Sequence, residues 1–542
     1  MRNRSVTDAP RPPQAHGNRG GALPSVTPTA ARAPEKPGLD RRWLTLPVLC
    51  IPLLIVSLDM TVLNVALPTL VRKLGATDSE LQWIVDAYVL VVGGLVLVSG
   101  SLADRVGRKW TFMAGLLIFA VCSTWAALSG SADVLIAARA SMGVGATLIM
   151  PSTLAIITNT FTDRAERQRA LGIWSGTTGA SIALGPIVGG LLLAHFDWGS
   201  VFLINVPIAI LGFIAAIWLV PNSRNAKSEP LDVAGSVLSI AGIGMLLWAI
   251  ISAPIHGWTS NIVLAAGFTG IALLTGFVWW ESHTAYPMLR LQFFRQRDFS
   301  GGIASLGLMM FALVGALFVL TQFLQFQLGN SALQAGVHML PAAGGIALIA
   351  PLSPVLVRRL GTKLTIAGGL LLAVGGLWQI SGATVTTTYS STLAGTVMLG
   401  LGVGLVMPAA IGAVMGNLPP EHTGLGSATN GAFIQVGGAL GVAIIGSALS
   451  TRYQDKLAAA LTGQPVPASI RSTVQGSLGA ALGVAQHIGG RAGAELSVVA
   501  RSAFMSGMTL GLRIGAGVAL AGVVLALVVL PLRTSIQSRS GR

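Results

Sequence analysis

The feature that most constrains this chain is a succession of apolar runs that match the thickness of a membrane. A helix of about 20 apolar residues spans the hydrocarbon core of a bilayer. Only 10% of the residues are charged, whereas soluble domains carry about 25%. We therefore predict an all-α polytopic membrane protein with fourteen spans. They cover residues 44–67, 81–101, 110–129, 133–157, 169–194, 200–220, 232–252, 261–280, 300–327, 335–357, 364–381, 392–416, 424–449 and 509–531.

The basic residues predict how these spans are oriented. With both termini in the cytoplasm, 25 of the 34 Lys and Arg residues lie on the cytoplasmic side, eight lie on the other side and Arg139 lies inside a span. Basic residues concentrate in the cytoplasmic loops of membrane proteins. Topology thus explains the net charge of +15. We expect the partner to be the lipid bilayer of the cell membrane and not nucleic acid.

The segments around the spans predict the domain organisation. Residues 1–43 are rich in Pro, Ala and Arg and are expected to form a disordered basic cytoplasmic tail. Residues 44–220 form an N-terminal six-helix bundle and residues 299–531 a C-terminal one. Residues 221–298 hold two linker spans followed by an interfacial segment of mixed aromatic and basic composition. Residues 532–542 form a second cytoplasmic tail.

The longest predicted connection is an external loop over residues 450–508. Its middle, residues 477–499, is mildly apolar but carries Gln, His, Arg and Glu. We expect one or two amphipathic surface helices there. A fifteenth span is the alternative for the same stretch.

An internal repeat relates the two bundles. Residues 100–111 align without gaps with residues 354–365, and GVGATLIMP at 143–151 resembles GLGVGLVMP at 400–408. Each pair occupies the same place in its half of the chain. Two parallel halves with a substrate site between them are the plan of major facilitator transporters.

The two halves differ in their polar residues. Arg358 occupies the position of Asp104, and Thr396 occupies that of Arg139. Because the first half keeps the ionisable residues, we expect it to carry the chemistry that couples transport to an energy source.

Three motifs carry a resemblance to a known family, which covers residues 44–531. GSLADRVGRK resembles the cytoplasmic loop signature of the major facilitator superfamily, at Gly100, Asp104, Arg105, Gly107, Arg108 and Lys109. The fifth span is similar to the glycine-proline signature of its antiporters, with serine for one glycine, at Gly172, Ser181, Gly185, Pro186, Gly189 and Gly190. LDMTVLNVALP, at 58–68, resembles the first-span signature of the fourteen-span drug/proton antiporters, the QacA/EmrB-like group.

This resemblance implies a major facilitator fold with two extra central helices between the bundles. It implies a proton-coupled antiporter that exports drugs, antibiotics or other amphipathic, often cationic compounds by alternating access. The loop at 100–109 would hold a cytoplasmic gate through contacts between the halves, and its alternative is a solvated basic loop. The bend at Gly185-Pro186 would serve antiport, and its alternative is a structural kink. No GxxxxGK[ST] motif occurs, so the proton gradient and no cofactor is expected to supply the energy. We expect a monomer.

Three ionisable residues inside spans are candidate proton-coupling residues, because charge at that depth is costly and usually functional. Asp59 lies about 22 Å from the cytoplasmic end of its span and about 12 Å from the outer end, and Arg139 lies about 9 Å from the outer end of its own. Burial disfavours the charged form of a carboxyl group. Asp59 is expected to exchange the proton, and the family implies that Arg139 assists its transfer. Asp86 would bind a cationic substrate or a second proton.

Each of these assignments has a structural alternative. Asp59 would be a structural carboxyl bonded to Thr61 or Asn64, Arg139 an arginine that extends to the outer interface, and Asp86 a carboxyl in an aqueous vestibule.

A further group of residues is predicted to line the substrate pocket, since aromatic and methionine surfaces suit varied apolar ligands. Ordinary core or lipid-facing positions are the alternative. The group is Asn64, Phe311, Phe318, Gln322, Phe326, Met398 and Met407.

Other functions on the same fold remain open at this point. They are a proton symporter, an exporter of a specific lipid or secondary metabolite, and a membrane sensor or scaffold that does not transport. The fifth-span signature argues against a symporter. An enzyme is not expected, because the sequence shows no metal-ligand cluster and no nucleophile–base arrangement.

Overall fold

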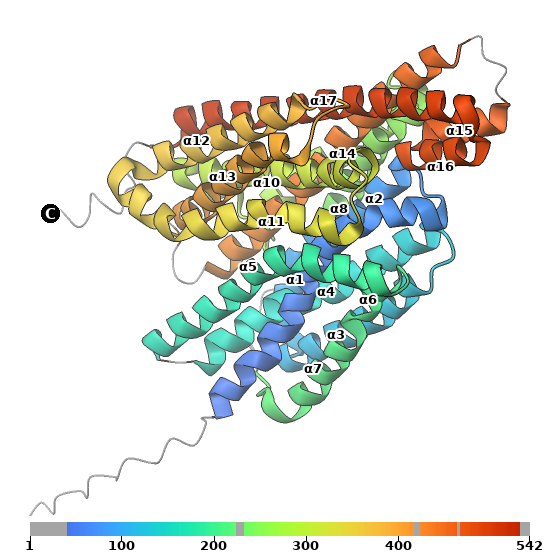
Figure 1. Cartoon of the computed structure of the whole chain (residues 1–542). Coiled ribbons are helices and arrows are strands. Elements are labelled where there is room, and N and C mark those ends of the chain that lie inside the picture. The colour runs from blue at the N-terminus through green and yellow to red at the C-terminus, as the bar shows by residue number, and fades with distance from the viewer. Residues whose placement is uncertain are drawn as a thin grey trace, which may run out of the picture. The chain divides into compact units, whose positions relative to one another are not determined.

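The computed structural model describes residues 41–531 apart from 162, 224–231, 417, 419–422 and 463–466. All regular structure in this part of the chain is helical (Figure 1). Twelve helical stretches in it are long and apolar enough to cross a membrane. The prediction of an all-α polytopic fold is confirmed, whereas the two predicted tails lie outside the described residues except for 41–43.

The amino-terminal bundle follows the predicted spans closely. Its helices are α1 (Arg41–Leu74), α2 (Asp78–Val106), α3 (Arg108–Ala127), α4 (Ala132–Thr160), α5 (Arg164–His195), α6 (Ser200–Leu203) and α7 (Asn205–Leu219). The two linker helices are α8 (Val233–His256) and α9 (Asn261–His283), and the short η1 (Leu291–Arg295) leads on from them.

The carboxy-terminal bundle repeats this order with additions at one end. Its elements are α10 (Arg297–Gln322), the π-helical η2 (Phe323–Gln327), α11 (Ala332–Ile349), η3 (Ala350–Leu352), α12 (Ser353–Ser381), α13 (Tyr389–Gly416), α14 (Thr423–Ala460), α15 (Ala468–Gly476), α16 (Leu478–Ile488) and α17 (Gly490–Val529).

The repeat found in the sequence is visible in the backbone. Gly107 has φ +115° where α2 meets α3, and its counterpart Gly361 has φ +85° inside α12. Both values lie in a region that favours glycine. The repeat also extends to helix starts that the sequence comparison missed. Thr77 and Glu80 form a capping box at α2, and Ser331 and Gln334 form one at α11.

Glycines at equivalent positions bring helices into close contact. A Cβ atom at Gly145 of α4 would lie 2.7 Å from the backbone nitrogen of Phe119 in α3. In the second half, a Cβ atom at Gly402 of α13 would lie 2.5 Å from the carbonyl oxygen of Gly369 in α12. Apolar helices gain little from leaving lipid for one another, so this packing stabilises each bundle.

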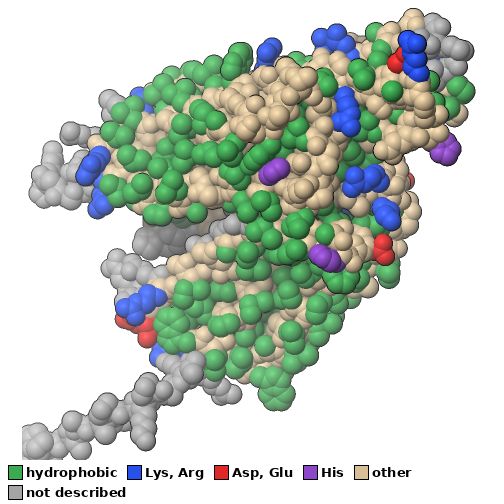
Figure 2. All heavy atoms as spheres, viewed as in Figure 1, with side chains coloured by type: hydrophobic (Ala, Val, Ile, Leu, Met, Phe, Trp, Pro, Cys, Tyr) green, Lys and Arg blue, Asp and Glu red, His purple; other side chains and the backbone are tan. Residues whose placement is uncertain are grey.

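The two ends of the molecule carry different helices. The terminal end is the end where α1 begins and α17 finishes, and the far end is the one that carries α15 and α16 (Figure 1). Figure 2 shows hydrophobic side chains along the sides of both bundles, with the surface hollowed between them at the terminal end.

The bundles meet along two seams, and the first lies between α2 and α14. Near the far end, Ser447 donates to Gln82 at 3.2 Å. Further along, a Cβ atom at Gly93 would lie 3.2 Å from Cβ of Gln435. This seam therefore extends along much of α2.

The second seam lies between α5 and α11, and its close backbone contacts lie toward the far end. A Cβ atom at Gly190 would lie 2.5 Å from Cα of Leu333, and one at Gly336 would lie 2.2 Å from the carbonyl oxygen of Pro186. Nearer the terminal end of α5, a Cβ atom at Gly172 would meet nothing within 4 Å.

The linker helices α8 and α9 pack against each other, and α8 also contacts both helices of the first seam. A Cβ atom at Gly94 of α2 would lie 2.1 Å from the side chain of Ile240 in α8. A hydrogen bond joins the start of α8 to the end of α9, because Trp280 Nε1 donates to Asp232 at 2.8 Å. The two extra helices therefore cover one side of the junction between the bundles.

The predicted loop at 450–508 differs from the structure. Helix α14 continues to Ala460, and α17 already begins at Gly490. The hydropathy of both helices falls where they leave the apolar core, but no helix breaker occurs there, so the backbone stays helical. The amphipathic helix expected in the middle exists as α16. It packs between the bundles' far ends, since a Cβ atom at Gly479 would touch Val71 and Phe326.

Gly402→Ala tests the close packing of the repeated helices. We expect it to lower the free energy of unfolding by about 1–3 kcal/mol, because the added methyl group meets the α12 backbone. The matched control is Gly412→Ala on the same helix, where a Cβ atom meets nothing within 4 Å. Thermal unfolding of the purified variants measures the difference. Equal stability of the two variants would show that the contact is not tight.

Candidate functional site

An ion pair lies inside the amino-terminal bundle. Arg139 of α4 binds Asp59 of α1 through Nη1 and Oδ2, and both side chains are 1% exposed. The pair joins two helices that the sequence placed at similar depth. Breaking a buried ion pair leaves an uncompensated charge, so each residue constrains the other.

Residues that the sequence analysis missed complete this site. Asn205 of α7 donates to Asp59 Oδ1 and to Ser123 Oγ of α3, both at 3.2 Å. Arg139 Nε donates to the carbonyl oxygen of Ile84 in α2 at 3.1 Å, and its guanidinium lies 4.3 Å from the ring centre of Tyr88. The sequence signal that could have identified Asn205 is its polar side chain within an apolar span.

The surroundings of Asp59 show which neighbours bind its carboxylate and which do not. Thr61 donates to the carbonyl oxygens of Leu58 and Ser181, and Asn64 donates to that of Met60. Neither therefore satisfies Asp59. Arg139 does not extend to an interface, because it is buried and paired.

The position of the pair corrects one expectation. The family plan implied that Asp59 and Arg139 face the cavity between the halves. Their partners in fact come from α2, α3 and α7 of the same bundle. Inside a packed bundle these donors and the ion pair can be mutually satisfied, which an open crevice would not allow. A change in the Asp59–Arg139 pair can therefore affect the other bundle only by moving helices of its own bundle.

The antiporter helix α5 provides such a route. Its residue Ser181 donates to the Leu54 carbonyl oxygen of α1 at 3.2 Å. A Cβ atom at Gly185 would lie 1.8 Å from Thr61 Oγ1, and one at Gly189 would lie 3.0 Å from Val62. The small residues of the motif thus let α5 approach α1 two residues from Asp59.

The other residues of the motif face the second bundle. Pro186 and Gly190 contact α11 at the second seam, as described above. Helix α5 is therefore held between the helix that carries Asp59 and the other half of the molecule.

Asp86 of α2 is buried, and neither of its carboxylate oxygens has a hydrogen-bond partner in the described structure. It lies one helical turn after Gln82, which bonds Ser447 across the first seam. Residues four apart share a face of a helix. Asp86 is thus on the α14 side of α2, and its buried side chain does not lie in the aqueous vestibule that was its structural alternative.

The described side-chain contacts of Asp104, Arg108 and Lys109 lie within the amino-terminal bundle, and the backbone N–H of Arg108 also donates to the Ser223 carbonyl oxygen at 3.0 Å. Arg108 binds Asp104 at 2.8 Å and donates to the Ala155 carbonyl oxygen of α4. Lys109 donates to the Ile217 carbonyl oxygen of α7 at 2.8 Å. Gly100 is open, with nothing within 4 Å of a Cβ atom. The described contacts of Asp104, Arg108 and Lys109 include none to the other half, so the gate remains a prediction.

The structure places the predicted pocket residues in several helices, and their role as a pocket lining stays a prediction. Phe311, Phe318 and Gln322 are buried in α10. Phe326 packs at the far end, against α16. A Cβ atom at Gly375 would lie 2.5 Å from the end of Met398, which places Met398 between α12 and α13.

The two remaining residues of the set are also placed. Asn64 is buried beside α1's own backbone, and Met407 is half-buried against the core.

Two repeated six-helix bundles that meet along two seams define the class of membrane transporters built from paired halves. A family model described as the Major Facilitator Superfamily matches residues 49–442, and the chain belongs to this superfamily. It is a multi-pass membrane protein and a transporter, not an enzyme.

Relatives and solved structures support this assignment. The chain is 34% identical to the tetracenomycin C resistance and export protein of Streptomyces glaucescens, over 92% of this chain and 93% of the relative. It is 35% identical to the multidrug efflux pump LfrA of Mycolicibacterium smegmatis, over 89% and 94%. A crystal structure of a bacterial homologue of the human lysosomal transporter Spinster shares the fold, with TM-score 0.64 and 16% identity over 92% of this chain and 99% of that one.

The buried ion pair can be tested by a double-mutant cycle. Asp59→Asn and Arg139→Gln should each lower the free energy of unfolding by about 3–5 kcal/mol, since each leaves a buried charge unpaired. The double variant should lose clearly less than the sum of the two. Thermal unfolding in detergent measures all four proteins.

The control for this cycle is the exposed pair Arg491–Glu495. Arg491→Gln should leave stability nearly unchanged, because exposed ion pairs contribute little. Strictly additive effects of Asp59→Asn and Arg139→Gln would contradict a direct interaction.

Proposed function

We propose that this chain is a proton-coupled antiporter that exports drugs, antibiotics or other amphipathic, often cationic compounds by alternating access. The observation that carries the proposal is the buried Asp59–Arg139 pair beside the antiporter helix. The names of its relatives support the export function. A third relative, the methyl viologen resistance protein SmvA of Salmonella typhimurium, is 34% identical over 86% of this chain and supports a cationic substrate.

The pair suggests how a proton is used. Protonation of Asp59 would remove its charge and release Arg139, which also holds the Ile84 carbonyl oxygen and the Tyr88 ring of α2. Helices α1, α2 and α4 would then readjust. Because α5 packs on α1 and on α11, this readjustment would reach the second seam and allow the bundles to tilt.

Asp86 has a different role in this proposal. A buried carboxylate without a partner is unfavourable, so Asp86 would be neutral in the conformation described here. When the bundles part along the first seam it would meet water and release its proton, or bind a cationic substrate. Ile84 and Tyr88 of the same helix contact Arg139, so a movement of α2 would link Asp86 to the ion pair.

We also propose fourteen spans, as in the QacA/EmrB-like group. Residues 332–381 count as one of the twelve apolar stretches, yet 50 residues of helix would be about 75 Å long. This is more than twice the thickness of a bilayer core, and η3 and Gly361 interrupt the stretch. Helices α11 and α12 then give two spans. Helix α5 (Arg164–His195) supplies the fourteenth, and its described part includes the apolar run Leu184–His195.

In this arrangement the terminal end faces the cytoplasm, as the distribution of basic residues predicts. The protein would reside in the cell membrane as a monomer, with protons and small amphipathic or cationic substrates as its partners. The proton gradient would supply the energy without a cofactor.

Asp59→Asn tests the coupling directly. Uptake of a panel of lipophilic cations and antibiotics into inverted vesicles, which corresponds to export from the cell, is measured with and without a proton gradient. We expect native protein to transport only with the gradient and Asp59→Asn to lose most of this transport. Asp133→Asn, which removes an exposed carboxylate at the start of α4, is the matched control and should behave as native.

Two results would reject parts of the proposal. Efflux that persists in the presence of an uncoupler would rule out proton antiport. Native transport by Asp59→Asn would remove Asp59 as the coupling group. A panel in which one compound alone is moved would favour an exporter of a specific metabolite, and no transport of any compound would favour a sensor or scaffold.

A cross-link across the first seam tests alternating access. Cγ of Gln82 lies 3.0 Å from the Cβ position of Gly446, and cysteines with Cβ atoms about 3.5–4.5 Å apart can form a disulfide. In a chain with Cys50→Ala and Cys122→Ala, oxidised Gln82→Cys/Gly446→Cys should stop transport, and a reductant should restore it. Each single-cysteine chain is the control. Undiminished transport by the cross-linked protein would mean that this seam need not open.

A further inference from the structure

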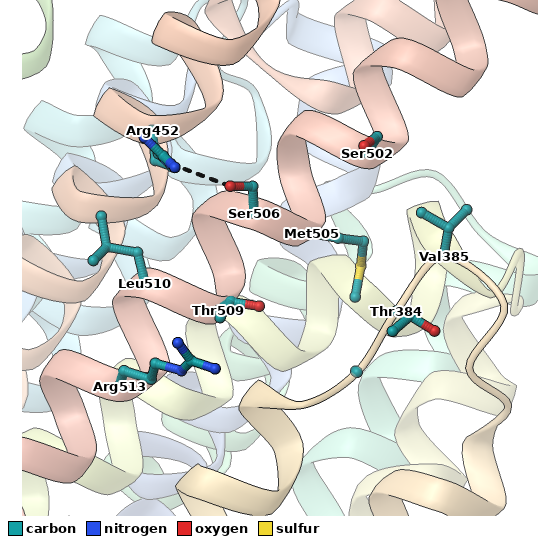
Figure 3. Close-up of a pocket in the computed structure, with 10 residues that line it drawn as sticks. Thr384, Val385, Arg452, Ser502, Met505, Ser506, Thr509, Leu510 and Arg513 are labelled. Atoms are coloured by element: carbon teal, nitrogen blue, oxygen red, sulfur yellow. Dashed lines mark hydrogen bonds between the residues drawn. The ribbon is translucent and has the colours of Figure 1, made fainter.

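A pocket lies in the carboxy-terminal bundle, away from both seams. Its volume is about 510 Å³, and it is formed by the turn after α12, the end of α14 and the middle of α17 (Figure 3). Arg452 and Arg513 line it together with hydroxyl groups, among them Ser502, Ser506 and Thr509. No residue assigned to transport above contributes to it.

Both arginines have N–H groups that no described residue binds. Arg452 Nε donates to Ser506 Oγ at 3.2 Å, which leaves its terminal nitrogens for other partners. Arg513 lies 5.3 Å from the ring centre of Trp378. Neither forms an ion pair with a carboxylate in the part of the chain that the structure describes. Two cations that face one pocket without a counter-ion favour an anionic ligand.

The pocket lies at the level of the membrane surface. Arg452 follows the predicted span 424–449 by three residues, and Arg513 is four residues inside the predicted span 509–531. At 1.5 Å per residue, both lie within about 6 Å of the expected boundary. Trp378 beside the pocket is 61% exposed, as is typical of tryptophans at the membrane interface.

The pocket lining combines polar and apolar residues, just as a phospholipid combines a polar headgroup with apolar chains. Arginine and hydroxyl groups suit a phosphate and a polyol, while Met505, Leu510 and Val385 supply apolar surface. A zwitterionic headgroup carries a cation that two guanidinium groups would repel. An anionic glycerophospholipid has no such cation, and its acyl chains would lie along the exposed apolar sides of α12 and α17.

We propose that this pocket binds the headgroup of an anionic phospholipid from the leaflet at the far end. The guanidinium groups of Arg452 and Arg513 bind its phosphate, and the hydroxyl groups around them bind the rest of the headgroup. The site is distinct from the Asp59–Arg139 pair and does not depend on the proposed transport function.

The test is lipid binding to the full chain, purified in a mild detergent and titrated with phosphatidylglycerol, with bound lipid counted by native mass spectrometry. We expect one tight site that Arg452→Gln/Arg513→Gln weakens at least about tenfold, because the variant removes the charge-assisted hydrogen bonds to the phosphate. The charge-matched control is Lys456→Gln/Arg491→Gln, which removes two exposed cations outside the pocket and should bind as native.

Further measurements distinguish a lipid headgroup from free phosphate as the ligand. A second variant shows whether misfolding of the arginine variant explains its loss of binding. Phosphatidylcholine should bind clearly more weakly, and millimolar inorganic phosphate should not displace phosphatidylglycerol. Ser502→Trp keeps both arginines but fills the pocket, and it should also remove the tight site. Unchanged binding by Ser502→Trp or by the double arginine variant, equal binding of the two lipids, or displacement by inorganic phosphate would overturn the proposal.

Discussion

Close contact between helix backbones is the constraint on which the rest of this structure depends. In a bilayer, apolar helices gain little by leaving lipid for one another, so packing must supply the attraction. Here glycines at matching positions of the two halves provide it, at Gly145 and Gly402 among others. Close contact of this kind also joins α7 to α1, where a Cβ atom at Gly212 would lie 2.9 Å from Pro52. In this bundle Asp59 of α1 binds Arg139 of α4 and accepts a hydrogen bond from Asn205 of α7. The ion pair is therefore a product of the packing, and it in turn fixes the register of these helices.

The all-helical membrane fold, the repeat and the superfamily could be predicted from the sequence because each rests on local information. Apolar length fixes a span, and Gly107 and Gly361 mark the same turn in both halves. The ion pair was anticipated only as two residues at similar depth. Its location inside the bundle could not be derived, because depth along a helix does not give the direction in which a side chain points.

The remaining differences have the same cause. The seven predicted pocket residues were chosen by type, which does not distinguish a crevice from a core, so their role stays a prediction. The extensions of α14 and α17 into the predicted loop at 450–508 were missed because hydropathy detects membrane, whereas helix formation needs only the absence of a breaker. Asn205 and Gln82 carried a usable signal, since a buried amide in an apolar span must find a partner.

The linker helices α8 and α9 have a consequence for access. Helix α8 lies against α2 and α14, and α9 packs on α8, so the two helices cover one junction between the bundles. At the junction between α5 and α11, the close backbone contacts at Gly190 and Gly336 lie toward the far end. In the proposed export, a compound dissolved in the leaflet at the terminal end would enter sideways past α5 and α11. The two inserted helices would thus restrict entry from the membrane to the side of the molecule that carries α5 and α11.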